Sequence, residues 1–75
     1  RIVIMRQAKV LTDLPAGTPI EIESMYNVKP YRGLSLGVST WNDSLGVWIL
    51  FTDGSEIFYC EQEIKAEGIM IVECS

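Results

Sequence analysis

The chain has 75 residues, of which 48% are hydrophobic and 21% are charged, and its net charge is −4. This balance is typical of one globular domain over residues 1–75, with a small core that buries about 60% of the unfolded surface. The sequence contains no histidine, which excludes Ser-His and Cys-His nucleophiles and histidine metal ligands. We therefore expect a protein that is not an enzyme and holds no cofactor and no metal.

The charge distribution narrows the class of partner. Residues 1–40 carry five basic and three acidic groups, whereas residues 41–75 carry one basic and seven acidic groups. Nucleic-acid binding requires clustered Lys and Arg, so we expect no nucleic-acid partner. No apolar run approaches the ~20 residues that span a bilayer, and no signal-peptide pattern is visible. The sequence predicts a cytoplasmic protein without a membrane partner.

The N-terminal third predicts short strands. Arg1–Met5 is apolar and β-branched, and Lys9–Leu11 either continues this strand or forms a second one. Two prolines and a glycine within residues 13–19 predict a turn. Residues 18–25 then alternate between apolar and acidic side chains, as in Ile20-Glu21-Ile22-Glu23, which predicts a strand with one buried face.

The middle of the chain predicts a loop, a strand and a turn. Pro30 and Gly33 argue against a helix over residues 24–33, so we expect a loop of about eight to ten residues there. Residues 34–40 alternate between large apolar and small side chains, which predicts a strand with one apolar face. Residues 41–46 contain Asn, Asp and Gly and predict a turn.

Residues 46–60 predict a β-hairpin with its tight turn at Asp53-Gly54. Both faces of this hairpin are apolar: Val47, Ile49 and Phe51 would share one face, and Trp48 and Leu50 the other, with Phe58 beside them. A small fold has one interior, so the second face is covered by the loop at residues 26–32, by the end strands or by another molecule. If it is exposed, it marks an interaction surface.

The C-terminal part predicts a short helical turn near residues 62–67, ending at Gly68, and a last strand at residues 69–73. The pattern favours an all-β fold, a small antiparallel barrel or sandwich of five to six strands. Cys60 and Cys74 are the only cysteines, and without a secretion signal we expect thiols rather than a disulfide.

The order of elements resembles the SH3-like barrel superfold. The resemblance rests on a Pro- and Gly-rich turn leading into Pro-Ile-Glu-Ile-Glu, a long loop, a three-strand meander with the hairpin Ile-Leu-Phe-Thr-Asp-Gly-Ser-Glu-Ile, and a helical turn before a closing strand. It implies a peptide-binding surface on which Tyr26 and Tyr31 lie close to Trp41 and Trp48. An OB-like barrel or an unclassified sandwich remains an alternative.

Two functions are consistent with these features. The first is a non-enzymatic protein-interaction module, such as an inhibitor, adaptor or accessory subunit, that docks on a protein partner through an aromatic patch with an acidic rim. The residues expected at that site are Tyr26, Tyr31, Trp41, Trp48, Asp43, Asp53 and Glu56. The alternative is a homo-oligomer that binds a small molecule or nucleotide at subunit seams, with Arg6, Lys29 and Arg32 as anion-binding residues.

Overall fold

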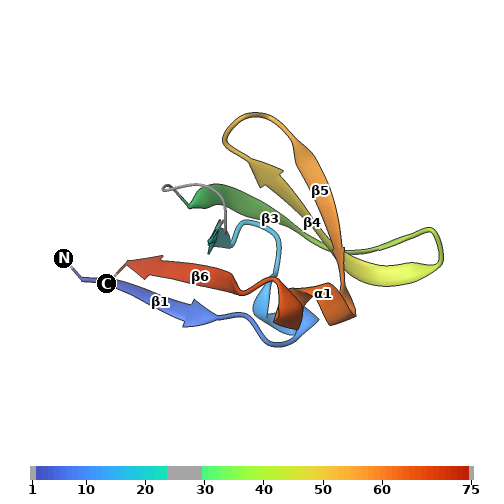
Figure 1. Cartoon of the computed structure of the whole chain (residues 1–75), viewed down its shortest axis with the longest axis horizontal. Helices are drawn as coiled ribbons and strands as arrows, with labels where there is room; N and C mark the ends of the chain where they lie inside the picture. The colour runs from blue at the N-terminus through green and yellow to red at the C-terminus, as the bar shows by residue number, and fades with distance from the viewer. Residues whose placement is uncertain (1, 24–29, 75) are drawn as a thin grey trace.

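The computed structural model describes residues 2–23 and 30–74 and shows a single six-stranded antiparallel sheet with one short α-helix (Figure 1). The strands follow the order β1-β6-β2-β3-β4-β5 across the sheet. In chain order the elements are β1 (Val3–Gln7), a 3-10 helix (Leu11–Asp13), β2 (Pro19–Ile22), β3 (Tyr31–Trp41), β4 (Ser44–Phe51), β5 (Glu56–Cys60), α1 (Glu61–Ala66) and β6 (Ile69–Cys74).

This arrangement confirms the predicted all-β fold of antiparallel strands with one helical turn. Helix α1 coincides with the turn expected near residues 62–67, and Gly68, with φ +65°, follows it. The sheet is open, because β1 and β5 are its two ends and do not pair with each other, so a closed barrel is not found. Within the described residues, no helix has the length and apolar character needed to cross a membrane.

The predicted N-terminal strand is present as an addition at the edge of the sheet. β1 pairs with β6 in a register that places Val3 opposite Cys74. The suggested strand at Lys9–Leu11 is wrong, because Leu11 begins a 3-10 helix. The Asp13 carboxylate stabilises the start of this helix by accepting hydrogen bonds from the backbone N–H groups of Lys9 and Val10.

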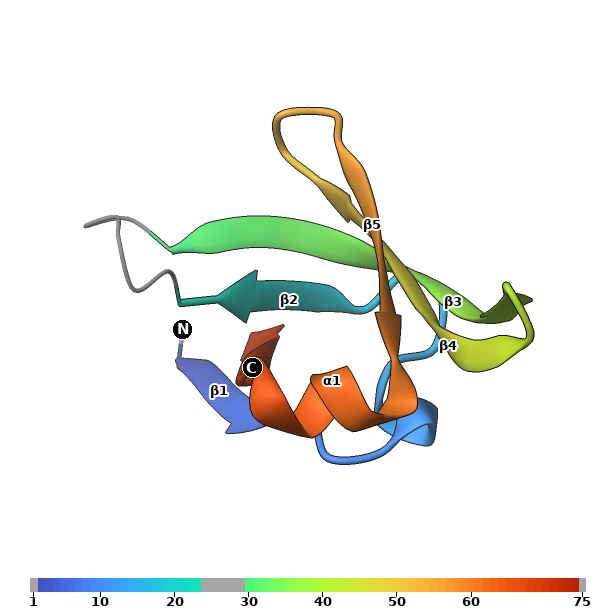
Figure 2. The same ribbon diagram turned by 45° about the vertical axis from the view of Figure 1, so that its right-hand side comes forward.

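The core lies between one face of the sheet and the two helices. Figure 2 shows α1 below β2 and β3 in that view, and its Ile64 is fully buried. The core side chains come from the inner face of the strands, from α1 and from the segment 8–14 around the 3-10 helix: Ala8, Leu11, Leu14, Ile20, Ile22, Val47, Ile49, Phe51, Ile64, Ile69 and Ile71. The alternation predicted for β2 and β4 is therefore confirmed.

In β3 the small side chain at position 35 faces the core, and the neighbouring large ones face solvent. Ser35 is fully buried, and its Oγ donates a 2.8 Å hydrogen bond to the Leu14 carbonyl oxygen. Leu34 and Leu36 are 40% and 42% exposed. A small residue is required at position 35 because the turn after Leu14 packs directly against β3, with the Gly17 N–H 2.8 Å from the Ser35 carbonyl oxygen.

Both predicted hairpin turns are present, but the strands around the first are longer than expected. The β4–β5 turn has Gly54 at φ +89°, and the Gly54 N–H donates to the Phe51 carbonyl oxygen at 2.9 Å. The β3–β4 turn consists of Asn42 and Asp43 alone, both with positive φ. Residues 31–33, expected in a loop, belong to β3, where they pair with β2.

Candidate functional site

Three aromatic rings meet on the face of the sheet opposite the core. Trp41 comes from the end of β3, Trp48 from the middle of β4, and Phe58 from β5 directly opposite Trp48. The ring centroids lie 5.4 Å apart for Trp48 and Phe58 and 5.6 Å apart for each pair that includes Trp41. The tilted and T-shaped geometries are favourable for aromatic pairs. The sequence placed both tryptophans at one site, and the structure brings them into contact.

The glycine at position 46 makes this cluster possible. A Cβ atom there would overlap the backbone oxygen of Tyr59 and lie 2.6 Å from Cζ of Phe58 and 2.9 Å from Cα of Cys60. The Phe58 ring therefore lies directly over a backbone that has no side chain. This packing role was not predicted from the sequence, where Gly46 closes the expected turn and opens the expected hairpin; its position between the apolar residues Leu45 and Val47 was the available signal.

Leucines extend the aromatic cluster into a larger apolar surface. Leu34 pairs with Leu50 across β3 and β4, and Leu36 lies two residues further along β3. Trp41 is 50% exposed, while Trp48, Leu50 and Phe58 are half-buried, largely against one another. We define the outer patch as Leu34, Leu36, Trp41, Trp48, Leu50 and Phe58. The helices pack on the other face of the sheet, so they do not cover the outer patch.

Two of the three predicted acidic rim residues lie next to the outer patch. Glu56 pairs with Leu50 and, together with Leu36 and Trp48, lines a shallow hollow on this face. Asp43 is exposed in the two-residue turn that follows Trp41. Asp53 instead lies at the tip of the β4–β5 hairpin, where its carboxylate accepts hydrogen bonds from Ser55.

The expected approach of Tyr31 to the tryptophans is not found. Tyr31 pairs with Ile22, which faces the core, so its side chain points to the inner face of the sheet. Its ring lies 6.2 Å from that of Phe51. The expectation failed because Tyr31 was assigned to a loop, whereas it belongs to a strand whose pairing sets its direction. Tyr26 and Lys29 lie outside the described residues.

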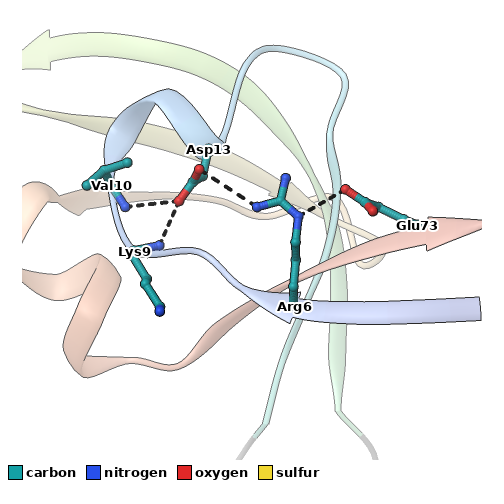
Figure 3. Close-up of polar contacts among 5 residues, drawn as sticks. All are labelled: Arg6, Lys9, Val10, Asp13 and Glu73. Atoms are coloured by element: carbon teal, nitrogen blue, oxygen red, sulfur yellow. Dashed lines mark hydrogen bonds and ion pairs between the residues drawn. The ribbon is translucent and has the colours of Figure 1, made fainter.

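The two described arginines of the proposed anion site lie on separate strands, and each forms ion pairs with carboxylates. Figure 3 shows Arg6 between two acids, with its Nε donating to Glu73 at 3.1 Å and its Nη1 3.8 Å from Asp13. Arg32 on β3 donates from Nε to Glu21 at 2.7 Å. Strands β6 and β2 lie between β1 and β3, so the two guanidinium groups do not converge. A phosphate bound at either arginine would compete with an existing ion pair.

The contacts of Asp13 predict how stability depends on pH. Backbone hydrogen bonds from Lys9 and Val10, assisted by the charges of Arg6 and Lys9, lower the pKa of the Asp13 carboxyl. Hydrogen bonds from Cys60 likewise lower the pKa of Glu63 at the start of α1. In both cases the folded state binds the proton less well than the unfolded state.

The free energy of unfolding is therefore expected to be constant above the unfolded pKa values of about 4 and to fall as the pH drops through the lower folded values. Urea titrations between pH 7 and pH 2 measure this decline. Asp13→Asn should make the acid decline shallower than in the wild type. An unchanged slope for this variant would contradict the assigned contacts.

Among the described side chains of residues 2–23 and 30–73, no three Cys, Asp or Glu cluster closely enough to form a metal site. Cys60 is a half-buried free thiol at the end of β5.

Comparison of the chain with models of protein families, with curated proteins and with solved structures found no match. The outer patch therefore has to be interpreted from its own chemistry.

Proposed function

We propose that the protein is a non-enzymatic interaction module that docks on a protein partner through the outer patch. The observation that supports this most is the three-ring cluster on a sheet face that the helices leave uncovered, in which Trp41 is 50% exposed and next to which Leu36 is 42% exposed. Contiguous exposed apolar surface on a small domain is typical of interaction sites, and tryptophan is enriched at their energetic centres.

The charges around the outer patch indicate the chemistry of the partner. Asp43 and Glu56 flank the patch at opposite ends of the hairpin strands, and the whole chain carries a net charge of −4. An apolar centre with an acidic rim fits a partner surface that has an apolar centre and basic residues around it. Such a module would serve as an inhibitor, adaptor or accessory subunit.

Affinity capture with matched baits tests this proposal. Leu36→Glu places a charge in the outer patch at a position that is already 42% exposed. Leu45→Glu places the same charge on the same sheet, at a 48% exposed position three residues from Trp48 and hence on the other face. We expect at least one protein from the native host lysate to bind the wild-type and Leu45→Glu baits but not Leu36→Glu.

The two baits must first be shown to unfold at similar urea concentrations, since both substitutions are at exposed positions. If all three folded baits recover the same proteins in the same amounts, the outer patch is not the docking surface.

One observation favours the second candidate, self-association. Every residue of β1 is exposed, including Val3 at 57% and Ile4 at 48%, and the outer edge of this strand pairs with none of the described strands. An apolar edge strand can pair with another chain. The ion pairs of Arg6 and Arg32 do not favour phosphate binding at a seam between copies. A strictly monomeric chain at micromolar concentration, measured by analytical ultracentrifugation, would contradict this candidate.

A further inference from the structure

A separate pocket lies on the inner face of the sheet, near the turn of the β4–β5 hairpin. It has a volume of about 270 Å³ and is lined by Tyr31, Phe51, Asp53, Ser55, Ile57 and Tyr59. We call it the tyrosine pocket. Strands β3, β4 and β5 each contribute to it, so residues far apart in sequence converge there. None of its lining residues belongs to the outer patch.

Three of the six residues that line the tyrosine pocket are aromatic. The Tyr31 and Phe51 rings have planes inclined at 73°, so they make two adjacent walls of a corner. Tyr59 contributes a third ring, and Tyr31 and Ile57 are 49% and 44% exposed, which leaves the pocket open to solvent. Burial and the nearby carboxylates of Glu67 and Glu63 raise the pKa of Tyr59, so its phenol is neutral at physiological pH.

A carboxylate held in place by hydrogen bonds, that of Asp53, also lines the tyrosine pocket. The Asp53 Oδ1 accepts hydrogen bonds from the Ser55 backbone N–H at 2.9 Å and from the Ser55 hydroxyl at 2.6 Å. These bonds lower the pKa of Asp53 and keep it ionised. Among the described residues that line the pocket there is no Lys or Arg, and the Arg32 side chain is paired with Glu21. The described lining of the pocket therefore combines three aromatic side chains with one negative charge and includes no compensating cation.

We propose that the tyrosine pocket binds an alkylammonium group. The electron-rich faces of aromatic rings attract a cation, and most strongly one with a diffuse charge and apolar substituents. The single carboxylate adds a charge-assisted contact. A metal ion would require several oxygen ligands, and the described lining residues include only one carboxylate. An anion would be repelled by Asp53. This site is independent of the outer patch and of the proposed docking function.

Nuclear magnetic resonance titration of the full chain with choline tests the proposal against a neutral isostere. In 3,3-dimethylbutan-1-ol a carbon atom replaces the quaternary nitrogen, so the shape is kept and the charge is lost. We expect choline to shift the backbone amide signals of Asp53, Ser55 and Tyr59 and to bind about tenfold more tightly than the alcohol. Equal binding of the two probes, or no binding of choline, would overturn the proposal.

Two substitutions of acidic turn residues provide a matched control. Asp53→Asn removes the charge of the pocket but keeps an oxygen that accepts the Ser55 hydrogen bonds. Asp43→Asn removes an equal charge from the other hairpin turn. Choline binding should weaken several-fold for Asp53→Asn and stay unchanged for Asp43→Asn. Equal weakening by both would indicate an effect of net charge alone and would overturn the assignment of the site.

The ammonium group can belong to a free small molecule or to a lysine side chain. A short neutral peptide containing trimethyllysine, titrated beside choline, distinguishes the two sources. Tighter binding of the peptide identifies a protein side chain as the ligand, and tighter binding of choline identifies a small molecule. Binding of neither would contradict the inference. The wild-type chain suffices for this comparison, so the result does not depend on how any variant folds.

Discussion

Replacing Gly46 by alanine is expected to lower the free energy of unfolding by about 3 kcal/mol, since overpacking costs this much when the neighbours cannot move. The added methyl group would overlap the Tyr59 backbone oxygen and lie 2.6 Å from the Phe58 ring. One of these neighbours is backbone in the adjacent strand, so a change of rotamer cannot relieve the contact. A domain of 75 residues has a total stability of roughly 4–11 kcal/mol, so the loss is large.

Urea denaturation measures this loss, and circular dichroism reports the aromatic cluster. Exciton coupling between the Trp41 and Trp48 rings should weaken in Gly46→Ala because the Phe58 ring must move. Ser39→Ala is the control, since Ser39 pairs with Gly46 across the sheet but is exposed, and its change should remain within about 0.5 kcal/mol. Equal stability of Gly46→Ala and wild type would contradict the close packing over Gly46.

Replacing Trp41 by alanine is expected to weaken partner binding by about 30-fold, which corresponds to about 2 kcal/mol for a tryptophan at the centre of an interface. Trp41 is 50% exposed and still contacts both Trp48 and Phe58, so the ring is held in place and available to a partner. The free energy of unfolding should fall by only about 1 kcal/mol, because the lost contacts are aromatic pairs at the surface.

The dissociation constant of the captured partner, measured by calorimetry, gives the size of this effect. Trp41→Phe is the matched variant, since it keeps an aromatic ring against Trp48 and should retain most of the affinity. If, in both variants, the affinity for the partner falls only in proportion to the free energy of unfolding, Trp41 supports the fold and does not contact the partner.

The local chemistry of the chain was sufficient to predict several of its elements. Asp53-Gly54 predicted the β4–β5 turn because glycine adopts the positive φ that the turn requires. The alternation around Ile20 predicted β2 and its buried face, and Gly68 predicted the end of α1. Each of these signals depends on residues within a few positions of one another, so the sequence contains them directly.

Which face of β3 points to the core could not be predicted, because this depends on segments that are distant in the sequence. Alternation showed that Ser35 and Leu36 point in opposite directions, but not which one faces the core. The turn after Leu14 decides this, since it packs against β3 and bonds to Ser35 across 21 positions of sequence. The same limit explains Tyr31, whose direction follows from its pairing with Ile22. It also explains the pairing of Arg6 with Glu73.

The orientation of β3, with Ser35 toward the core and Leu34 and Leu36 toward solvent, makes the candidate site larger than the sequence indicated. The hairpin β4–β5 alone would present Trp48, Leu50 and Phe58. With Leu34 and Leu36 also facing outward, the apolar surface continues onto a third strand. Burying Ser35 thus helps to shape the outer patch, because it places Leu34 and Leu36 on the same face as the tryptophans.

The most direct test of the outer patch is the dissociation constant of the captured partner for Leu36→Glu and Leu45→Glu, measured side by side with wild type. The two substitutions introduce the same charge at similarly exposed positions, and they differ in the face of the sheet. We expect Leu36→Glu to bind at least tenfold more weakly than wild type, because a carboxylate buried in an apolar interface is left unpaired. Leu45→Glu should bind like wild type. Equal affinities of the two variants would contradict the assignment of the outer patch as the docking surface.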